Sequence, residues 1–212
     1  MTTANKITLT RICMIPFFLY FASQPLLAPD PADFGMVFPT NTIIALVLFC
    51  VASFTDFLDG YVARKYNQVT DFGKFVDPLA DKLLVTSALV LLTEQGKIAG
   101  WMVCIILARE FIITSLRVVA AGAGRVLAAT WTGKVKTCVQ IGGIIVIYLT
   151  YILLGTTGGT LPLHWYVSAN GVTEPYIVLI AGWVMTFVTI YSGWDYLRKN
   201  WDIIKDGAVR KK

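Results

Sequence analysis

Charged residues are scarce in this chain. Asp, Glu, Lys and Arg make up 15% of its 212 residues, whereas an average globular protein has about 25%. Hydrophobic residues make up 56%, and the mean hydropathy is +0.67. This composition excludes an ordinary soluble domain and is typical of a membrane protein. At this length we expect one membrane domain over residues 1–212.

Cysteine and histidine are too few and too scattered to indicate a redox or zinc site. The four cysteines lie inside apolar runs without CxxC spacing: Cys13, Cys50, Cys104 and Cys138. This placement predicts small buried residues rather than metal ligands or a disulfide framework. The single histidine, His164, lies beside Trp165 and Tyr166 and is interpreted as a residue of the membrane interface.

Lysine and arginine are absent from two long segments, residues 25–40 and 155–174, and the turn at 94–97 contains only Lys97. All the others lie in the N-terminus, in residues 56–82, in residues 109–136 or in the C-terminal tail. Because Lys and Arg favour cytoplasmic segments, both termini are expected in the cytoplasm, with the tail on anionic headgroups. The net charge of +5 then reflects topology and gives no reason to expect nucleic acid binding.

Six apolar segments approach the roughly 20 residues that a transmembrane helix needs: residues 11–28, 41–60, 78–94, 98–121, 134–154 and 175–197. We therefore predict an all-α integral membrane protein with six transmembrane helices, multi-pass in the plasma membrane. The first segment could instead be a signal peptide. The polar residues that precede it have a better interpretation, given below.

The stretch DFLDGYVARKYNQVTDFGKFVDPLAD, residues 56–81, brings negative charge to the end of the second span and the start of the third. Asp56 and Asp59 are three residues apart, and Asp77 and Asp81 are four apart, so each pair shares a helix face. A single aspartate of this kind is more simply a helix cap. Four converging carboxylates would repel unless cations lay between them, and oxygen ligands suit Mg²⁺, Mn²⁺ or Ca²⁺. The stretch therefore predicts a two-metal site that polarises a phosphoryl group.

Small and basic residues in the same stretch fit a bound phosphate. Gly60, Ala63 and Gly73 let a ligand approach the backbone closely. Arg64 can donate two hydrogen bonds to a phosphate.

Together these residues form the pattern D-x2-D-G-x2-A-R-x8-G-x3-D-x3-D. The pattern resembles the complete signature of the CDP-alcohol phosphotransferase family. The resemblance implies a six-helix fold in which the four aspartates hold two metal ions, Mg²⁺ or Mn²⁺, beside the pyrophosphate of a CDP-linked donor. It further implies that Asp81 is the general base for the acceptor hydroxyl, that the active site faces the cytoplasm, and that the protein is a homodimer.

The opening NKITLTR, residues 5–11, is similar to the N-terminal N-x-x-T-x-x-R segment of the same family. Asn5, Thr8 and Arg11 match that pattern. The resemblance implies a short interfacial helix near the nucleotide, with Asn5 and Thr8 on the donor side. This interpretation accounts for the polar approach to the first span better than a signal peptide does.

Charged residues also interrupt the fourth span, where Arg109 and Glu110 lie between apolar runs. They are either a buried or snorkelling ion pair or the polar wall of an active-site cavity. Arg117 follows Glu110 by seven residues and lies on nearly the same helix face. A basic pocket for an acceptor that carries its own phosphate is predicted from five residues: Arg109, Arg117, Arg125, Lys134 and Lys136.

The runs AREFIITSLR (108–117) and TGKVKT (132–137) resemble the bacterial branch of the family that makes phosphatidylglycerophosphate. The implied reaction transfers the phosphatidyl group of CDP-diacylglycerol to sn-glycerol 3-phosphate and releases CMP. Other acceptors remain open, namely inositol phosphate, serine or a second phosphatidylglycerol. A membrane prenyltransferase and a cation transporter are more remote alternatives, because the aspartate pairs lie close together in sequence and at the cytoplasmic edge.

Overall fold

The computed structural model describes residues 3–24, 39–66, 71–122, 127–128, 130–156, 165–167 and 173–202. Within these ranges only the backbone is described for residues 3–8, 56–66, 71–79, 81, 155, 165–167 and 173–174. The described elements are α1 (Thr3–Ala22), α2 (Thr40–Tyr66), α3 (Asp71–Glu94), α4 (Gly100–Gly122), α5 (Trp131–Thr156), β1 (Trp165–Val167), β2 (Thr173–Pro175) and α6 (Tyr176–Lys199).

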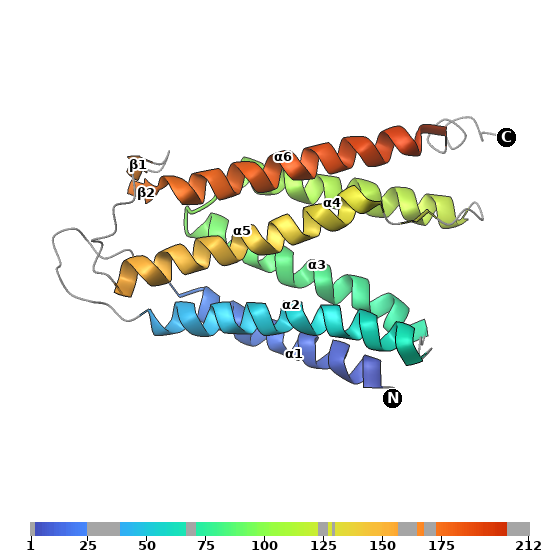
Figure 1. Ribbon diagram of the computed structural model, residues 1–212, viewed down its shortest axis with the longest axis horizontal. Coiled ribbons are helices and arrows are strands. Elements are labelled where there is room, and N and C mark those ends of the chain that lie inside the picture. The colour runs from blue at the N-terminus through green and yellow to red at the C-terminus, as the bar shows by residue number, and fades with distance from the viewer. Residues whose placement is uncertain are drawn as a thin grey trace.

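The six helices run alternately up and down a single bundle (Figure 1). As a result α1, α3 and α5 begin, and α2, α4 and α6 end, at the same end of the molecule, which we call the terminal end. The antiparallel pair β1–β2 lies at the opposite end. This alternation gathers chain segments that are far apart in sequence at the terminal end.

Several hydroxyl groups inside the apolar helices donate hydrogen bonds within their own helix. The hydroxyl of Thr55 donates to the carbonyl of Val51 at 2.7 Å, and that of Thr189 donates to the carbonyl of Met185 at 2.6 Å. Such bonds to the preceding turn remove the cost of a hydroxyl without a partner in an apolar setting.

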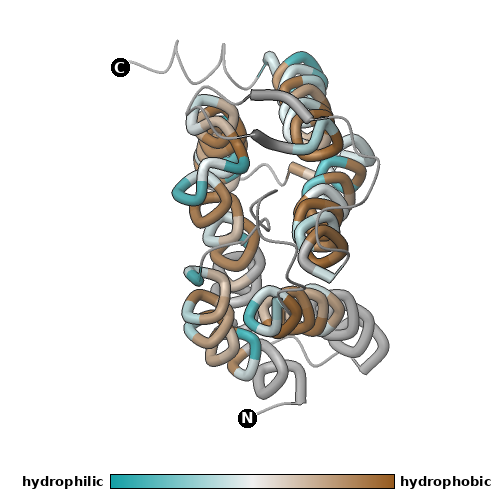
Figure 2. The backbone as a smooth tube through the Cα atoms, turned by 90° about the vertical axis from the view of Figure 1, so that its left-hand side faces the viewer, coloured by the Kyte–Doolittle hydropathy of each residue, from teal (hydrophilic) through white to brown (hydrophobic). Residues whose placement is uncertain are grey.

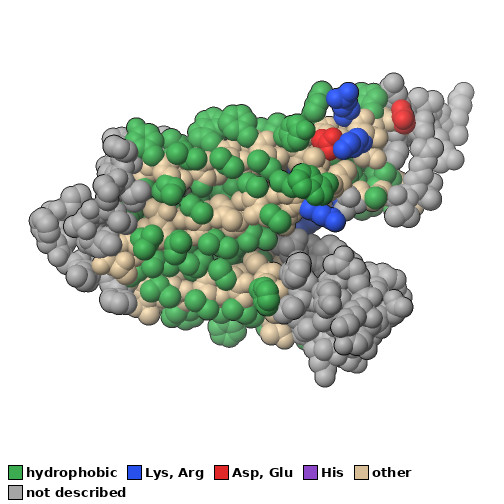
Figure 3. Space-filling view, viewed as in Figure 1, with side chains coloured by type: hydrophobic (Ala, Val, Ile, Leu, Met, Phe, Trp, Pro, Cys, Tyr) green, Lys and Arg blue, Asp and Glu red, His purple; other side chains and the backbone are tan. Residues whose placement is uncertain are grey.

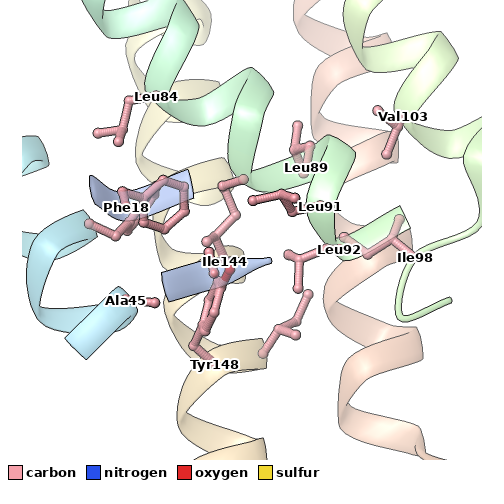
Figure 4. Close-up of a cluster of buried hydrophobic side chains, with 14 of the residues drawn as sticks. Phe18, Ala45, Leu84, Leu89, Leu91, Leu92, Ile98, Val103, Ile144 and Tyr148 are labelled. Atoms are coloured by element: carbon pink, nitrogen blue, oxygen red, sulfur yellow. The ribbon is translucent and has the colours of Figure 1, made fainter. Parts of the chain in front are cut away.

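The core lies where α3 packs against its neighbours, which are α1, α2, α4 and α5. Phe18 of α1 is fully buried, and its ring centroid lies 5.8 Å from that of Phe49 on α2 and 6.5 Å from that of Tyr148 on α5 (Figure 4). Leu89 and Leu92 of α3 are buried in the same cluster. Tilted and edge-on ring pairs at these distances stabilise the helix contacts beyond the area that they bury.

Large apolar side chains also cover the outside of the bundle. Phe111 and Trp194 are each 68% exposed, and hydrophobic residues lie on all sides of the coloured helices in Figure 2. The segments Trp131–Leu154 and Tyr176–Lys199 are long and apolar enough to cross a membrane, and Leu9–Ala22 and Thr40–Thr55 are shorter apolar segments. An apolar exterior of this extent is typical of a chain that contacts lipid.

The six predicted helices are present, with three corrections. The separate interfacial helix expected for residues 5–11 does not form, because nothing in that sequence stops the helix and these residues open α1. The pair β1–β2 was not expected. Cys13, Cys104 and Cys138 are exposed free thiols rather than buried ones, because an apolar run does not reveal which of its residues face outward.

Candidate functional site

The structure places the two helical parts of the aspartate stretch, at the end of α2 and the start of α3, at the terminal end of the bundle. The last turns of α2 carry Asp56, Asp59, Gly60, Ala63 and Arg64, and the first part of α3 carries Gly73, Asp77 and Asp81. The helices α2 and α3 contact each other. The backbone therefore brings the two halves of the pattern together, while the positions of these side chains lie outside the described part of the structure.

The chemistry of these residues fits a divalent metal. Among the side chains that the structure describes, no three metal-ligating groups lie together, and the four aspartates are not among those side chains. Four carboxylates supply the oxygen ligands that Mg²⁺ and Mn²⁺ prefer. The metal site itself remains a prediction.

The last residue of the N-terminal pattern, Arg11, lies inside the bundle. Asn5 and Thr8 lie in the first turns of α1, with side chains outside the described set. Arg11 of the same helix is only 1% exposed. Because α1 packs against α2 and α3, this buried guanidinium lies on a helix that contacts both of the helices that carry the aspartates.

A cavity of about 280 Å³ opens among α3, α4, α5 and α6, near the lower end of the roughly 300–1,000 Å³ of small-molecule sites. Among the described residues, its charged lining consists of one acid and five bases: Glu110, Lys82, Arg109, Arg117, Lys134 and Lys136. The Lys and Arg side chains visible in Figure 3 likewise gather at the terminal end. Four of the five residues predicted to form the basic pocket thus line one cavity: Arg109, Arg117, Lys134 and Lys136. Arg125 lies outside the described residues.

Glu110 links two of these cations. Its Oε1 atom lies 3.0 Å from Nη1 of Arg109 and 2.5 Å from Nζ of Lys136. The ion-pair interpretation of Arg109 and Glu110 is confirmed, and both residues also line the cavity. That this cavity belongs to the active site stays a prediction. The bridge fixes the side chains of α4 and α5 relative to each other.

Hydroxyl groups, which carry no negative charge, hold Arg117 and the second terminal nitrogen of Arg109. The Nε atom of Arg117 donates to the hydroxyl of Tyr196 at 3.2 Å, and Nη2 of Arg109 donates to the hydroxyl of Ser192 at 2.7 Å. Lys134 is exposed and forms no ion pair with a described residue. The lining therefore has more positive charge than it neutralises, so an anionic ligand is favoured there.

Lys82 is a lining residue that sequence analysis missed. It directly follows Asp81 on α3, and its Nζ atom donates to the hydroxyl of Thr114 on α4. The sequence signal that could have identified Lys82 is its position directly after Asp81. Because Lys82 lines the cavity and is the residue next to Asp81, the cavity and the aspartate stretch are adjacent on α3.

Comparison with known proteins matches residues 1–191 to the family described as CDP-alcohol phosphatidyltransferase. The chain belongs to this family. It is 43% identical, over 95% of its length and 96% of the relative's, to a Bacillus subtilis protein named CDP-diacylglycerol–glycerol-3-phosphate 3-phosphatidyltransferase. A Rickettsia bellii protein of the same name is 33% identical over 92% of both chains.

A Mycobacterium tuberculosis protein named probable phosphatidylglycerophosphate synthase is 34% identical, over 92% of this chain and 80% of the relative. Membership of the CDP-alcohol phosphatidyltransferase family confirms the resemblance drawn from the aspartate stretch and makes the chain an enzyme. Members of this family generally depend on divalent metal ions.

Proposed function

We propose that the protein transfers the phosphatidyl group of CDP-diacylglycerol to sn-glycerol 3-phosphate, giving phosphatidylglycerophosphate and CMP. The observation that carries this proposal is the cavity lined by five basic residues. One of them, Lys82 on α3, directly follows Asp81 in the sequence. Such a cavity favours an acceptor with a phosphate of its own. The names of the relatives that cover nearly the whole chain support the same reaction.

The donor is assigned to the ends of α1, α2 and α3 that meet at the terminal end. Four aspartates would hold two divalent ions, Mg²⁺ or Mn²⁺: Asp56, Asp59, Asp77 and Asp81. Six residues would bind the CDP moiety: Asn5, Thr8, Gly60, Ala63, Arg64 and Gly73. When bound, the ions neutralise charge on the pyrophosphate and on the departing CMP.

Within this site Asp81 takes the proton from the acceptor hydroxyl. The acceptor oxygen then forms a bond to the phosphorus on the diacylglycerol side, while the bond from that phosphorus to the CMP oxygen breaks. Arg109, Arg117, Lys134 and Lys136 hold the acceptor phosphate, so that its hydroxyl faces the donor. Lys82 adds a fifth positive charge on the side nearest Asp81.

The proposed arrangement in the membrane has six transmembrane spans in one domain of residues 1–212, with both termini and the active site in the cytoplasm. Two observations support it. Apolar side chains cover the sides of the bundle, and the cavity cations lie at the terminal end, as the positive-inside rule requires for a cytoplasmic end. The donor's acyl chains would stay in the plasma membrane while CMP leaves to the cytoplasm. A homodimer is proposed from the family resemblance.

The proposal is tested by CMP release from purified protein in micelles with CDP-diacylglycerol and Mg²⁺ or Mn²⁺. Glycerol 3-phosphate, inositol phosphate, serine and phosphatidylglycerol are supplied one at a time. Release with glycerol 3-phosphate alone is expected, and release with another acceptor alone would refute the assignment.

Asp81→Asn is expected to abolish release while CDP-diacylglycerol still binds. Turnover comparable to that of the unmodified protein would exclude Asp81 as the base.

A further inference from the structure

One turn near the end of α6 contacts both α4 and α5, the helices that bring four of the five bases to the cavity. Ser192 contacts Arg109 on α4, Tyr196 contacts Arg117 on α4, and Asp195 contacts Thr132 at the start of α5. These partners are separated from the turn by 83, 79 and 63 residues in sequence. We refer to residues 192–196 as the α6 turn.

Ser192 and its neighbour Gly193 set the path of the Arg109 side chain. Ser192 is only 1% exposed, and its hydroxyl accepts a hydrogen bond from Nη2 of Arg109 at 2.7 Å. A Cβ atom at Gly193 would lie 3.0 Å from Cγ of Arg109. The missing side chain at Gly193 thus lets the arginine lie against α6, and the hydroxyl of Ser192 fixes the direction of its guanidinium.

Tyr196 holds Arg117 in two ways. Its hydroxyl accepts a hydrogen bond from Nε of Arg117 at 3.2 Å, and Cζ of Arg117 lies 5.4 Å from the centre of the same ring. Tyr196 is 1% exposed and therefore has little freedom to move. With Nε engaged, the two Nη groups of Arg117 have no hydrogen-bond partner among the described residues and stay available for a phosphate.

Asp195 fixes the start of α5. Its Oδ2 atom accepts a hydrogen bond from the hydroxyl of Thr132 at 2.8 Å and lies 2.9 Å from Nζ of Lys199. Thr132 precedes Lys134 and Lys136 in the first turns of α5. The α6 turn therefore places cations from both α4 and α5, although it contributes no charge of its own to the phosphate.

We propose that the α6 turn is the positioning element of the acceptor pocket and gives the enzyme its preference for a phosphorylated acceptor. The inference rests on the proposed function. The turn contacts Arg109, Arg117 and the start of α5, and these segments supply four of the five bases that line the cavity. Because these contacts orient the groups assigned to the acceptor phosphate, changes in the turn are expected to alter use of the acceptor more than use of the donor.

The test uses two variants that each remove one hydroxyl, Ser192→Ala and Tyr196→Phe, in the full-length protein in micelles. Loss of a hydrogen bond that orients a charged group is expected to raise KM for glycerol 3-phosphate about five- to tenfold. The KM for CDP-diacylglycerol and kcat are expected to stay within about twofold, since neither residue reaches the donor.

Matched controls come from the same helix. Thr186→Val removes a buried hydroxyl that bonds only to the carbonyl of Gly182 within α6. Tyr191→Phe removes a hydroxyl from a tyrosine that is 65% exposed. Both controls are expected to keep the acceptor KM of the unmodified protein.

A double-mutant comparison separates positioning from a general effect on folding. If Tyr196 acts through Arg117, then Tyr196→Phe adds less than about twofold to the acceptor KM in an Arg117→Ala background. Ser192→Ala behaves the same way in an Arg109→Ala background. An unchanged acceptor KM in both single variants, an equal rise in the donor KM, or full additivity with the arginine variants would each overturn the inference. Unmodified protein that does not use glycerol 3-phosphate would instead refute the proposed function.

Discussion

At the scale of single residues, Glu110 is the least expected member of the cavity. Among the described lining residues it is the one acid, and a cavity for an anion is not improved by a carboxylate. Its Oε1 atom lies within ion-pair distance of both Arg109 and Lys136, whose side chains are 12% and 7% exposed. Two cations so little hydrated need a counter-charge when no acceptor is bound. We infer that Glu110 supplies that charge until the acceptor phosphate arrives.

Glu110→Gln is therefore expected to lower the stability of the ligand-free protein by about 1–3 kcal/mol, because two buried cations lose their shared carboxylate. Glycerol 3-phosphate should then raise the midpoint of thermal unfolding more in the variant than in the unmodified protein, since its phosphate replaces the missing charge. Thermal unfolding in micelles with and without glycerol 3-phosphate measures both effects. Glu94→Gln, at an exposed residue of α3, is the control. An equal rise of the unfolding midpoint with glycerol 3-phosphate in the variant and in the unmodified protein would contradict the counter-charge role of Glu110.

At the scale of helices, the close packing of α5 on α6 depends on a single glycine. A Cβ atom at Gly143 would lie 2.5 Å from Sδ and 2.7 Å from Cγ of Met185, whereas one at Gly142 would meet nothing within 4 Å. Met185 is 1% exposed, so its side chain has no solvent-filled space to move into. Small residues permit such close approach between membrane helices.

Gly143→Ala is expected to destabilise the protein by about 1–3 kcal/mol through overpacking, while Gly142→Ala, at the adjacent position, is expected to be neutral or slightly stabilising. The midpoint of thermal unfolding in detergent distinguishes the two variants. Met185→Ala combined with Gly143→Ala should recover part of the loss, because it removes the atoms that the new methyl group meets. Equal behaviour of the two alanine variants would show that this contact does not limit the helix spacing.

The helices were predictable because the length of each apolar run can be read directly from the sequence. The aspartate stretch was predictable because its residues lie close together in the sequence. The contacts of the α6 turn were not. Arg109 meets Ser192 across 83 residues, and nothing local in the α6 sequence distinguishes Ser192 or Tyr196 from other polar residues of a membrane helix. The exposed cysteines were missed for a related reason, since outward and inward faces of a membrane helix are both apolar.

At the scale of the whole molecule, the bundle has two chemically different ends. The cavity cations lie at the terminal end. At the opposite end Lys97 is 8% exposed, and its Nζ atom lies 4.4 Å from the centre of the Tyr151 ring. A cation held against an aromatic ring contacts less water than a free one. The contact with Tyr151 therefore explains how Lys97 is accommodated at the end of the bundle opposite the cavity cations.

A topology experiment follows from this difference. In a chain whose four cysteines are replaced by serine, a single cysteine is introduced at Asp202 or at Glu94, which are both exposed and lie at opposite ends of the bundle. A membrane-impermeant maleimide is expected to label Glu94→Cys in intact cells, and to label Asp202→Cys only after permeabilisation. The reverse pattern would place the cavity on the outer side and refute the proposed orientation.

The most direct measurement is the kinetics of Arg109→Ala with each substrate varied in turn, beside Arg198→Ala, which removes the same charge from an exposed residue of α6. If the cavity binds the acceptor phosphate, Arg109→Ala lowers kcat/KM for glycerol 3-phosphate about 10- to 100-fold, the effect of losing a charge-assisted hydrogen bond. The KM for CDP-diacylglycerol stays within about twofold, and Arg198→Ala behaves as the unmodified protein. Unchanged KM and kcat for glycerol 3-phosphate in Arg109→Ala would show that the acceptor binds elsewhere.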